Sequence, residues 1–302
     1  MRITELFTSG HAFPTLEIVP PLSGITQQEL LDSIRPLMEF QPRYINVTTH
    51  RDEVRYTPQP DGTYKREVVR SRVSPVAVCA CIQAHFQVEV VPHLICSGQS
   101  ARELEWQMQD FRFMGIENVM ALRGDSLSGE KRFSPERDGY SHASELVSAL
   151  RAQGGFCVGV GGYPEKHFEA PNLETDIEYL KAKVDAGADY IITQMFFDNK
   201  VFYRFVSLCR AAGIAVPIVP GLKPLTTLRQ VEMLPESFSI DIPPALTRAV
   251  REAGSDREAV RSIGIDWCIA QCKDLLSHGV PAIHFYTMGK SRNISEVLRA
   301  AF

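Results

Sequence analysis

A carboxylate inside an apolar segment is the first residue of this sequence whose type and surroundings suggest chemistry. Glu17 lies within the segment Leu16–Val19, among leucine, isoleucine and valine. Burying a carboxylate in such surroundings is costly unless it gains a partner or takes up a proton. Desolvation raises the pKa of a carboxyl group toward the range in which it serves as a general acid. Glu17 is therefore a candidate proton donor, and the structural alternative is a salt bridge at the end of a strand.

Further polar side chains stand at comparable points of later apolar segments. His93 lies between Pro92 and Leu94 and is either an acid–base group or a hydrogen-bonded histidine of the core. Asp125 closes an Arg-Gly-Asp sequence. It is either a helix cap or turn residue, or a charge that repels negative charge on a reduced cofactor ring or binds the N–H groups of a heterocycle. The other segment ends carry Thr48, His50, His167, Gln194, Lys223, His284 and Tyr286.

The common metal-binding and nucleotide-binding motifs do not occur in the sequence. The pairs Cys79/Cys81 and Cys268/Cys272 are close in sequence, but neither has zinc-site loop spacing or a histidine pair nearby. We therefore expect buried thiols and no metal. The segment Gly159–Pro164 has two glycines of the dinucleotide fingerprint but proline in place of the third. A Rossmann-type nucleotide site is accordingly not expected.

Composition limits the class of protein. The chain has 302 residues, 44% of them hydrophobic and 23% charged, and a formal charge of −4. These values exclude a disordered or collagen-like chain, and the acidic balance argues against nucleic acid as the main partner. No run of about 18 apolar residues occurs, so no membrane span is expected. The seven cysteines are scattered and the N-terminus lacks a signal-peptide pattern, so we expect a cytoplasmic protein.

Eight apolar runs, rich in valine and isoleucine, are the elements that must position these side chains. Because they are mostly continuous rather than alternating, they predict strands buried on both faces. The expected strands are Pro14–Pro20, Tyr44–Thr49, Val88–Cys96, Asn118–Arg123, Phe156–Gly161, Tyr190–Phe197, Ala215–Pro220 and Ala282–Thr287.

Helical patterns separate these strands. They cover Gln27–Phe40, Arg102–Met114, His142–Arg151, Leu173–Ala186, Lys200–Ala211, Thr226–Leu234 and Arg257–Ser277. Four of them are followed by a glycine, namely Gly115, Gly187, Gly213 and Gly279. Glycine commonly ends a helix there, because it adopts the left-handed conformation at low cost. Eight alternating units predict an α/β protein, a single-domain (β/α)₈ TIM barrel over residues 1–302, with an open doubly wound sheet as the alternative. In a barrel the site lies at the carboxyl ends of the strands.

Seven motifs occur in the order typical of one enzyme family. They are LEIVPP at 16–21, VPHLIC at 91–96, ALRGD at 121–125, GYPEKH at 162–167, KVDAGADYIITQMFFD at 183–198, PGLKP at 220–224 and HFYT at 284–287. From about residue 14 to its C-terminus the chain resembles methylenetetrahydrofolate reductase, in the short catalytic-domain-only form found in bacteria.

The resemblance implies a flavoprotein oxidoreductase. Such an enzyme passes a hydride from NADH or NADPH to non-covalent FAD, in a ping-pong cycle that reduces 5,10-methylenetetrahydrofolate to 5-methyltetrahydrofolate for methionine synthesis. It implies Glu17 and Asp125 as catalytic residues, and a homo-oligomer. The implied FAD contacts are Thr48, His93, Arg123, Gly124, Asp125, Tyr163, His167, Asp176 and Lys183. The implied folate contacts are Glu17, Asp125, Gln194, Tyr286 and Lys290.

The sequence also departs from the family pattern. Ile18 and Val19 replace aromatic residues, Tyr179 and Ala182 replace polar or basic FAD-contacting residues, Leu234 replaces a stacking aromatic residue, and Lys290 replaces arginine. The segments 51–72 and 131–139 have no role that the sequence assigns. The alternatives are a pterin-binding barrel methyltransferase without flavin, a Schiff-base lyase using Lys183, Lys223 or Lys290, and a non-catalytic flavin-binding protein.

Overall fold

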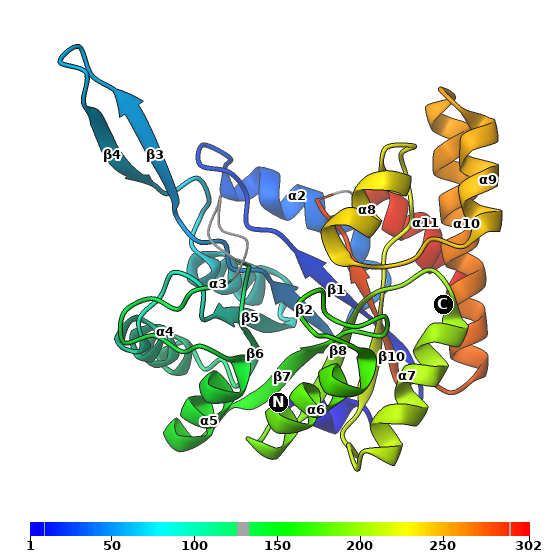
Figure 1. Ribbon diagram of the computed structural model, residues 1–302. Coiled ribbons are helices and arrows are strands. Elements are labelled where there is room, and N and C mark those ends of the chain that lie inside the picture. Colours follow the sequence, from blue (N-terminus) through cyan, green and yellow to red (C-terminus); the bar gives the residue numbers. More distant parts are fainter. Residues whose placement is uncertain (9, 126–132, 290) are drawn as a thin grey trace.

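A closed barrel of eight parallel strands forms the centre of the computed structural model, which describes residues 1–8, 10–125, 133–289 and 291–302 (Figure 1). The strands are β1 (Phe13–Ile18), β2 (Tyr44–Val47), β5 (Glu89–Ile95), β6 (Asn118–Leu122), β7 (Cys157–Gly162), β8 (Tyr190–Met195), β9 (Ile218–Leu222) and β10 (Ala282–Tyr286). Strand β1 pairs with both β2 and β10, which closes the sheet. The predicted (β/α)₈ barrel is confirmed, and the open-sheet alternative is wrong.

All eight predicted runs contain a barrel strand. Their ends differ by a few residues, and the largest difference is in the seventh run, where β9 begins at Ile218 rather than Ala215 and extends to Leu222. The continuous apolar runs reflect the barrel geometry, because each strand contacts helices on one face and the barrel interior on the other.

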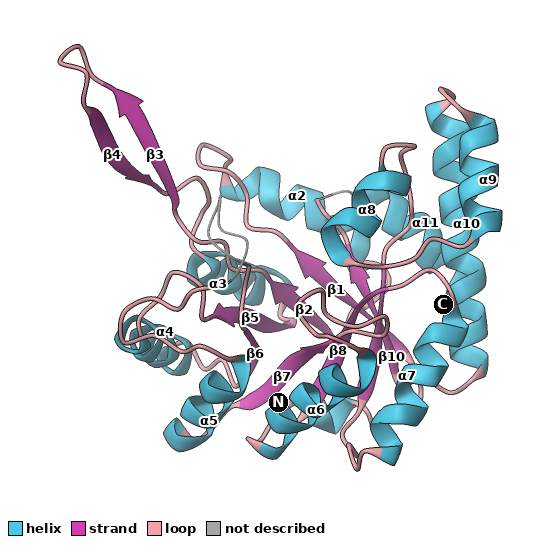
Figure 2. Ribbon diagram, in the orientation of Figure 1, coloured by secondary structure: helices cyan, strands magenta, loops and turns pink. Residues whose placement is uncertain are grey.

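Helices surround the barrel (Figure 2). They are α2 (Gln27–Met38), α3 (Pro75–Phe86), α4 (Ala101–Phe113), α5 (Ala143–Gln153), α6 (Leu173–Asp185), α7 (Asn199–Ala211), α8 (Gln230–Phe238), α9 (Pro244–Ala253), α10 (Arg257–Ser277) and α11 (Ser291–Ala301), with a short α1 (Ile3–Leu6) at the N-terminus. The seven predicted helices are confirmed, although α8 begins later than expected. The four terminating glycines Gly115, Gly187, Gly213 and Gly279 all have positive φ, between 72° and 117°.

Four helices are missing from the sequence prediction. Helix α3 is apolar almost throughout, so its sequence lacks the alternation of faces that reveals a helix. Helices α9 and α11 are amphipathic and were detectable, α9 with proline at its first position. Helix α1 is a single turn, and its Ile3 and Leu6 pack under the amino end of the barrel with Phe13, Tyr44 and Tyr190.

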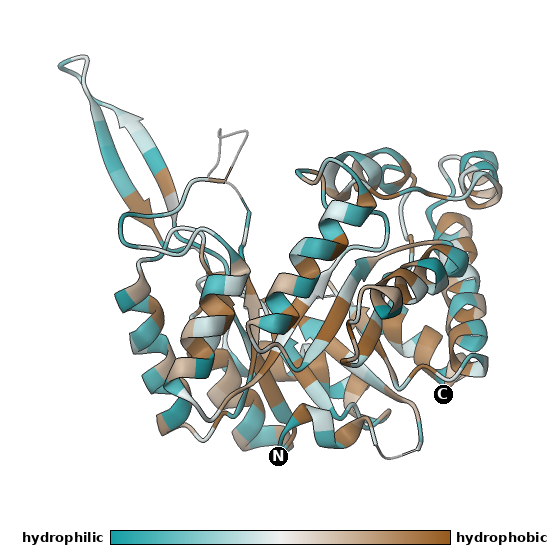
Figure 3. Ribbon diagram, turned by 60° about the horizontal axis from the view of Figure 1, so that its bottom comes forward, coloured by the Kyte–Doolittle hydropathy of each residue, from teal (hydrophilic) through white to brown (hydrophobic). Residues whose placement is uncertain are grey.

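Two apolar layers hold the barrel together, and both contribute to the hydrophobic centre that Figure 3 shows. The larger layer joins the outer faces of the strands to the helices. The smaller layer fills the barrel interior near its amino end and includes Tyr190. Gly159 is required there, because a Cβ atom at this position would lie 2.5 Å from Cζ of Tyr190. The filled lower half leaves the polar residues at the carboxyl ends as the place for chemistry.

An antiparallel hairpin interrupts the barrel pattern after β2. Its strands β3 (Glu53–Pro58) and β4 (Tyr64–Val69) pair only with each other and extend away from the barrel (Figure 1). The sequence contained its turn signal, Pro60-Asp61-Gly62 between two β-rich stretches. The strands expected from the sequence include none within residues 51–72, so the hairpin is a correction.

Candidate active site

Glu17 lies between two histidines inside the carboxyl end of the barrel. Its Oε2 atom is 3.6 Å from Nε2 of His93 on β5 and 3.8 Å from Nε2 of His284 on β10. All three side chains are largely buried. Thr15, two residues before Glu17 on β1, lies with its Oγ1 atom 2.8 Å from Nδ1 of His284. Thr15, His284 and Glu17 thus form a continuous polar chain that ends at the carboxylate.

The two imidazoles reverse the pKa shift that burial alone would cause. Burial raises the pKa of Glu17, but hydrogen bonding to His284 and the charges of His93 and His284 bring it below its ordinary value. The expectation that the apolar strand keeps Glu17 protonated is therefore wrong. Burial also lowers the pKa of His93 to about 4. The site thus favours the ionised form of Glu17, whereas burial favours the neutral form of His93.

Tyr286 packs against the histidine beside Glu17. Its ring meets that of His284 edge-on, with centroids 5.1 Å apart, and its hydroxyl donates to the carbonyl of Thr193 at 2.7 Å. Gly221 makes room for it, because a Cβ atom there would lie 2.7 Å from the tyrosine ring. The hydroxyl of Tyr286 is thus engaged with β8, and the ring is the part that a ligand in the barrel could contact.

The loop after β6 forms a second group of polar residues at the rim. Nη1 of Arg123 lies 2.5 Å from Oε2 of Glu169, and its guanidinium lies over the ring of Phe133. Gly124 has φ of +82°, and a Cβ atom there would lie 2.9 Å from Cβ of Ser97. The backbone therefore passes close to β5 in a conformation that favours glycine. Asp125, which follows, is exposed to solvent at the end of this turn.

The loop after β7 contributes the neighbouring rim residues. The rings of Tyr163 and His167 meet edge-on with centroids 4.8 Å apart. Asp176, at the start of α6, accepts a hydrogen bond from the backbone N–H of His167 at 3.0 Å and so holds the loop in place. The amine of Lys183, in the last turn of α6, donates to the carbonyl of Gly161 at 2.6 Å.

These rim residues fit an anionic cofactor. Burial lowers the pKa of Lys183 to about 8, and Asp176 opposes this shift. Within the described chain, no carboxylate lies within 4 Å of the Lys183 amine. A half-buried cation without an ion pair is costly, and a diphosphate group beside it would compensate the charge. Lys183 is therefore the residue best suited to hold the diphosphate of a dinucleotide, and Arg123, paired with Glu169, is a second cation at the same rim.

The remaining predicted residues have more local roles in the structure. Thr48 lies with its hydroxyl 3.1 Å from Nε2 of His50. The side-chain oxygen of Gln194 accepts the backbone N–H of Met195 at 3.0 Å, which leaves the amide nitrogen for other partners. Leu234 is fully buried with Met195, so it faces the core of α8 to α10 rather than the barrel interior. Lys290 lies outside the described residues.

The sequence places His284 at a strand end without indicating a role for it, and it gives no sign of Thr15 or Asn46 as site residues. All three side chains point into the barrel, because alternate residues of a strand point to the same side. His284 is two residues from Tyr286, and Thr15 is two residues from Glu17. Asn46 pairs with Glu17 in register, is fully buried, and has neither side-chain polar atom hydrogen-bonded. The signal that could have found them is this two-residue spacing from an identified site residue.

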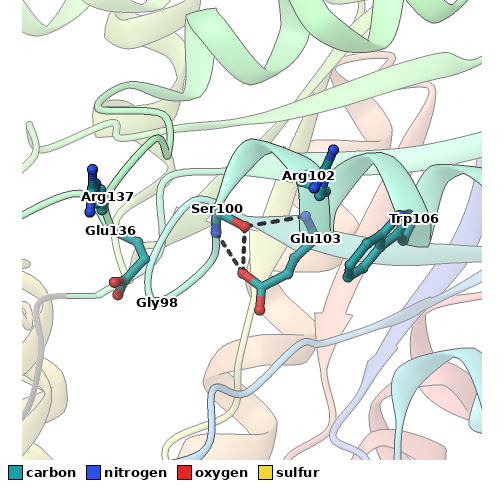
Figure 4. A pocket seen from close by; sticks show the side chains of 7 residues that line it. All are labelled: Gly98, Ser100, Arg102, Glu103, Trp106, Glu136 and Arg137. Atoms are coloured by element: carbon teal, nitrogen blue, oxygen red, sulfur yellow. Dashed lines mark hydrogen bonds between the residues drawn. The ribbon is translucent and has the colours of Figure 1, made fainter.

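Outside the barrel, a surface hollow of about 470 Å³ lies at the amino end of α4. Its lining residues are Gly98, Ser100, Arg102, Glu103, Trp106, Glu136 and Arg137 (Figure 4). None of the predicted site residues lines it. In the described residues, no group of three or more His, Cys, Asp or Glu side chains could hold a metal ion. No helix in the same part of the chain is long and apolar enough to cross a membrane.

Comparison with known proteins relates this geometry to a family. Residues 2–301 match the family model of methylenetetrahydrofolate reductase. The chain is 31% identical to 5,10-methylenetetrahydrofolate reductase of Escherichia coli over 282 residues, covering 93% of this chain and 88% of that protein. It is 32% identical over 308 residues to methylenetetrahydrofolate reductase (NADH) 1 of Arabidopsis thaliana, covering 98% of this chain but 49% of the plant protein. The chain thus spans about half the length of its plant relative.

Solved structures support the fold. A protein from Clostridium thermocellum, described as binding two copies of 5-methyl-5,6,7,8-tetrahydrofolic acid, has a TM-score of 0.58 and 13% identity, with 98% of this chain and 97% of that chain covered. At this identity the likeness concerns the barrel alone. The assignment to a family rests on two findings. The family model matches nearly the whole chain, and the alignment with the bacterial relative covers most of both proteins. This chain belongs to the methylenetetrahydrofolate reductase family.

Proposed function

We propose that this protein reduces 5,10-methylenetetrahydrofolate to 5-methyltetrahydrofolate, with electrons from NADH or NADPH passed through non-covalently bound FAD in a ping-pong cycle. Family membership supports the reaction. The relatives carry names of both nicotinamide types, NADH in Arabidopsis thaliana and NADPH in Caenorhabditis elegans, which leaves the choice between the two open. The product would supply methyl groups for methionine synthesis.

The observation that carries this proposal is the carboxylate of Glu17 between two imidazoles, at the carboxyl end of the barrel. Opening the five-membered ring of the substrate breaks a carbon–nitrogen bond, and the departing nitrogen takes a proton. A largely buried carboxyl group at the carboxyl end of the barrel is suited to deliver that proton. In the free protein Glu17 is ionised, but a substrate seated over it removes solvent and raises its pKa. Glu17 therefore takes up its proton as the substrate binds.

The polar chain behind Glu17 orients its carboxyl group. Nε2 of His284 faces the carboxylate, while Nδ1 faces the hydroxyl of Thr15. Thr15 thereby fixes the orientation of the imidazole ring, as second partners of catalytic histidines commonly do. His93 contacts the carboxylate from the other side and limits its movement.

The rim residues bind the cofactor in this proposal. Arg123 and Lys183 hold the diphosphate, Gly124 allows close backbone approach, and Tyr163 and His167 line the adjoining surface, together with Thr48 and Asp176. FAD, when bound, supplies the hydride-accepting and hydride-donating chemistry. Asp125 and Gln194, one charged and one amide, recognise the N–H and carbonyl groups of the pterin.

The test is the visible absorbance of the purified protein, followed by anaerobic titration. We expect an oxidised flavin spectrum that bleaches with NADH or NADPH and returns when 5,10-methylenetetrahydrofolate is added. A colourless protein that gains no flavin when incubated with FAD, yet transfers a methyl group from 5-methyltetrahydrofolate, would favour the methyltransferase instead. Flavin that no nicotinamide reduces would favour a non-catalytic flavoprotein. Borohydride inactivation with a carbonyl substrate would indicate a lyase.

A further inference from the structure

His50 lies at the carboxyl end of the barrel, where the chain leaves β2. The backbone N–H of Thr48 donates to the last carbonyl of β1 at 3.1 Å, and the hydroxyl of Thr49 donates to the carbonyl of His93 on β5. These bonds hold the segment between β1 and β5, the strands that carry Glu17 and His93. His50 comes directly after them, so its position over the ends of both strands is fixed.

The side chain of His50 points to the same side as the inward-facing residues of β2. Its Nε2 atom lies 3.1 Å from the hydroxyl of Thr48, two residues earlier. Alternate residues of an extended segment point to the same side, and Tyr44, four residues before Thr48, packs in the barrel interior. Thr48 and His50 therefore continue this inward row, and His50, which is open to solvent, is its outermost member.

The two ends of the β3–β4 hairpin are anchored beside this histidine. Arg51, directly after His50, lies next to Gly98 on the β5 side, because a Cβ atom on the glycine would be 3.8 Å from Cβ of the arginine. Arg72, at the other end of the hairpin, donates from Nη1 to the carbonyl of Pro20 at 2.8 Å, just after β1. The hairpin is thus fixed to the rim on both sides of His50 and has a structural part in placing it.

The charged groups that face His50 come from several elements of the rim. Desolvation by the surrounding protein and the charge of Arg72 lower the pKa of His50, whereas the charges of Glu17 and Asp125 oppose this shift. His93 lies within range as well, since a charge on His50 lowers the pKa of His93. The site therefore favours a neutral imidazole at His50, close to both Glu17 and Asp125.

His50 differs from the two buried histidines of the site in having a ring nitrogen available on the open side. Nε2 of His93 and Nε2 of His284 face Glu17, and the other nitrogen of His284 is also engaged. Among the residues that the structure describes, Nδ1 of His50 has no hydrogen-bond partner. The Thr48 hydroxyl can donate to Nε2 or accept from it, so Nδ1 can offer a ligand either an N–H or a lone pair.

We propose that His50 binds the folate substrate through Nδ1, between the pterin that Asp125 recognises and the nitrogen that Glu17 protonates. This inference rests on the proposed function and adds a substrate contact to it. Proton transfer from Glu17 carries a positive charge onto the substrate, and a neutral imidazole does not repel that charge. The hydrogen bond to His50 therefore holds the substrate at the open side of the site without opposing the reaction.

Isothermal titration calorimetry of the flavin-loaded protein with 5-methyltetrahydrofolate tests the contact. The amide of asparagine places a polar atom near the position of Nδ1, whereas the longer glutamine places its amide near the position of Nε2. His50→Gln should therefore weaken folate binding about fivefold, the effect of losing one neutral hydrogen bond, and His50→Asn should weaken it less than about twofold. The matched control is His85→Gln, an exposed histidine of α3 outside the site, which should bind the folate as the wild type does.

NMR of the histidine ring nitrogens tests whether the folate reaches Nδ1. The resonances of His50 are assigned by their absence from the spectrum of His50→Asn. We expect the Nδ1 resonance of His50 to move by several parts per million when the wild-type protein is saturated with 5-methyltetrahydrofolate. The resonances of His85 should stay in place.

The outcomes separate this inference from the proposed function. Folate binding that leaves the His50 resonances unmoved, or that both His50 variants retain at wild-type strength, would overturn the inference while the proposed function stood. His50→Asn binding more weakly than His50→Gln would also overturn it. A protein that binds the folate through His50 but takes up no flavin would refute the proposed reaction and support the inference. A wild-type protein that binds no 5-methyltetrahydrofolate would overturn both.

Discussion

Replacing Glu17 by glutamine should separate the two halves of the proposed reaction. Glutamine keeps the size of the side chain but cannot lose or donate a carboxyl proton. Reduction of the flavin by a nicotinamide needs no proton donor to the folate, so that half-reaction should remain within about twofold of wild type. Opening the methylene-bridged ring does need one, and loss of a general acid commonly lowers the rate by about 10² or more.

The structure sets the scale and the companion variant. A factor of about 10² corresponds to about 2.7 kcal/mol in the barrier of the folate half-reaction. Thr15→Val removes only the contact between the hydroxyl and Nδ1 of His284. Because one hydrogen bond contributes about 0.5–1.5 kcal/mol, this variant should slow the folate half-reaction by about two- to tenfold. The order wild type, Thr15→Val, Glu17→Gln is thus predicted.

Anaerobic rapid mixing measures the two steps separately. Oxidised enzyme is mixed with NADH or NADPH while flavin absorbance falls, and reduced enzyme is mixed with 5,10-methylenetetrahydrofolate while it recovers. Equal slowing of both steps in Glu17→Gln would make Glu17 a structural or flavin-binding residue and refute the mechanism. If neither step slowed, the proton donor would lie elsewhere, and His93 would be the next candidate.

Three further predictions concern the rim and the loop contacts. Lys183→Met should make FAD dissociate about ten- to a hundredfold more readily, because a charge-assisted bond contributes about 1.5–3 kcal/mol; unchanged flavin retention on dilution would contradict it. Asp125→Asn should raise the flavin midpoint potential by tens of millivolts, because it removes a charge that repels the reduced flavin; about 30 mV in a two-electron couple equals about 1.4 kcal/mol. The same variant should weaken folate binding. A lower potential with intact folate affinity would contradict both roles. Burial raises the pKa of Glu165 to about 7, while its Oε1 accepts the backbone N–H of Asp241 and its Oε2 has no partner. The folded state therefore holds a proton that the unfolded state releases between about pH 4.5 and 7, and stability falls as pH rises through this range. Glu165→Gln should raise the melting temperature at pH 8 but not at pH 4; equal melting curves of the two proteins at pH 8 would exclude this role.

Much of the fold could be predicted because burial on both faces leaves a mark in each strand sequence. Eight continuous apolar runs, separated by helices that stop at glycine, are sufficient to indicate a barrel. The same order identified Glu17, His93 and Asp125 as residues at strand ends. The hairpin was not predicted, because its strands carry charged residues on both faces in place of an apolar run.

The geometry at Glu17 depended on closure of the barrel. Thr15 and His284 are 269 residues apart in sequence, and they meet because β1 pairs with β10. From the sequence, only the desolvation of Glu17 could be inferred, which led to a raised pKa. The tertiary structure places His93 and His284 against the carboxylate and lowers that pKa instead. Sequence by itself determined which side chains reach the carboxyl ends of the strands. Only the closed barrel decided which of them touch, because the sign of a buried group's pKa shift is set by its spatial neighbours.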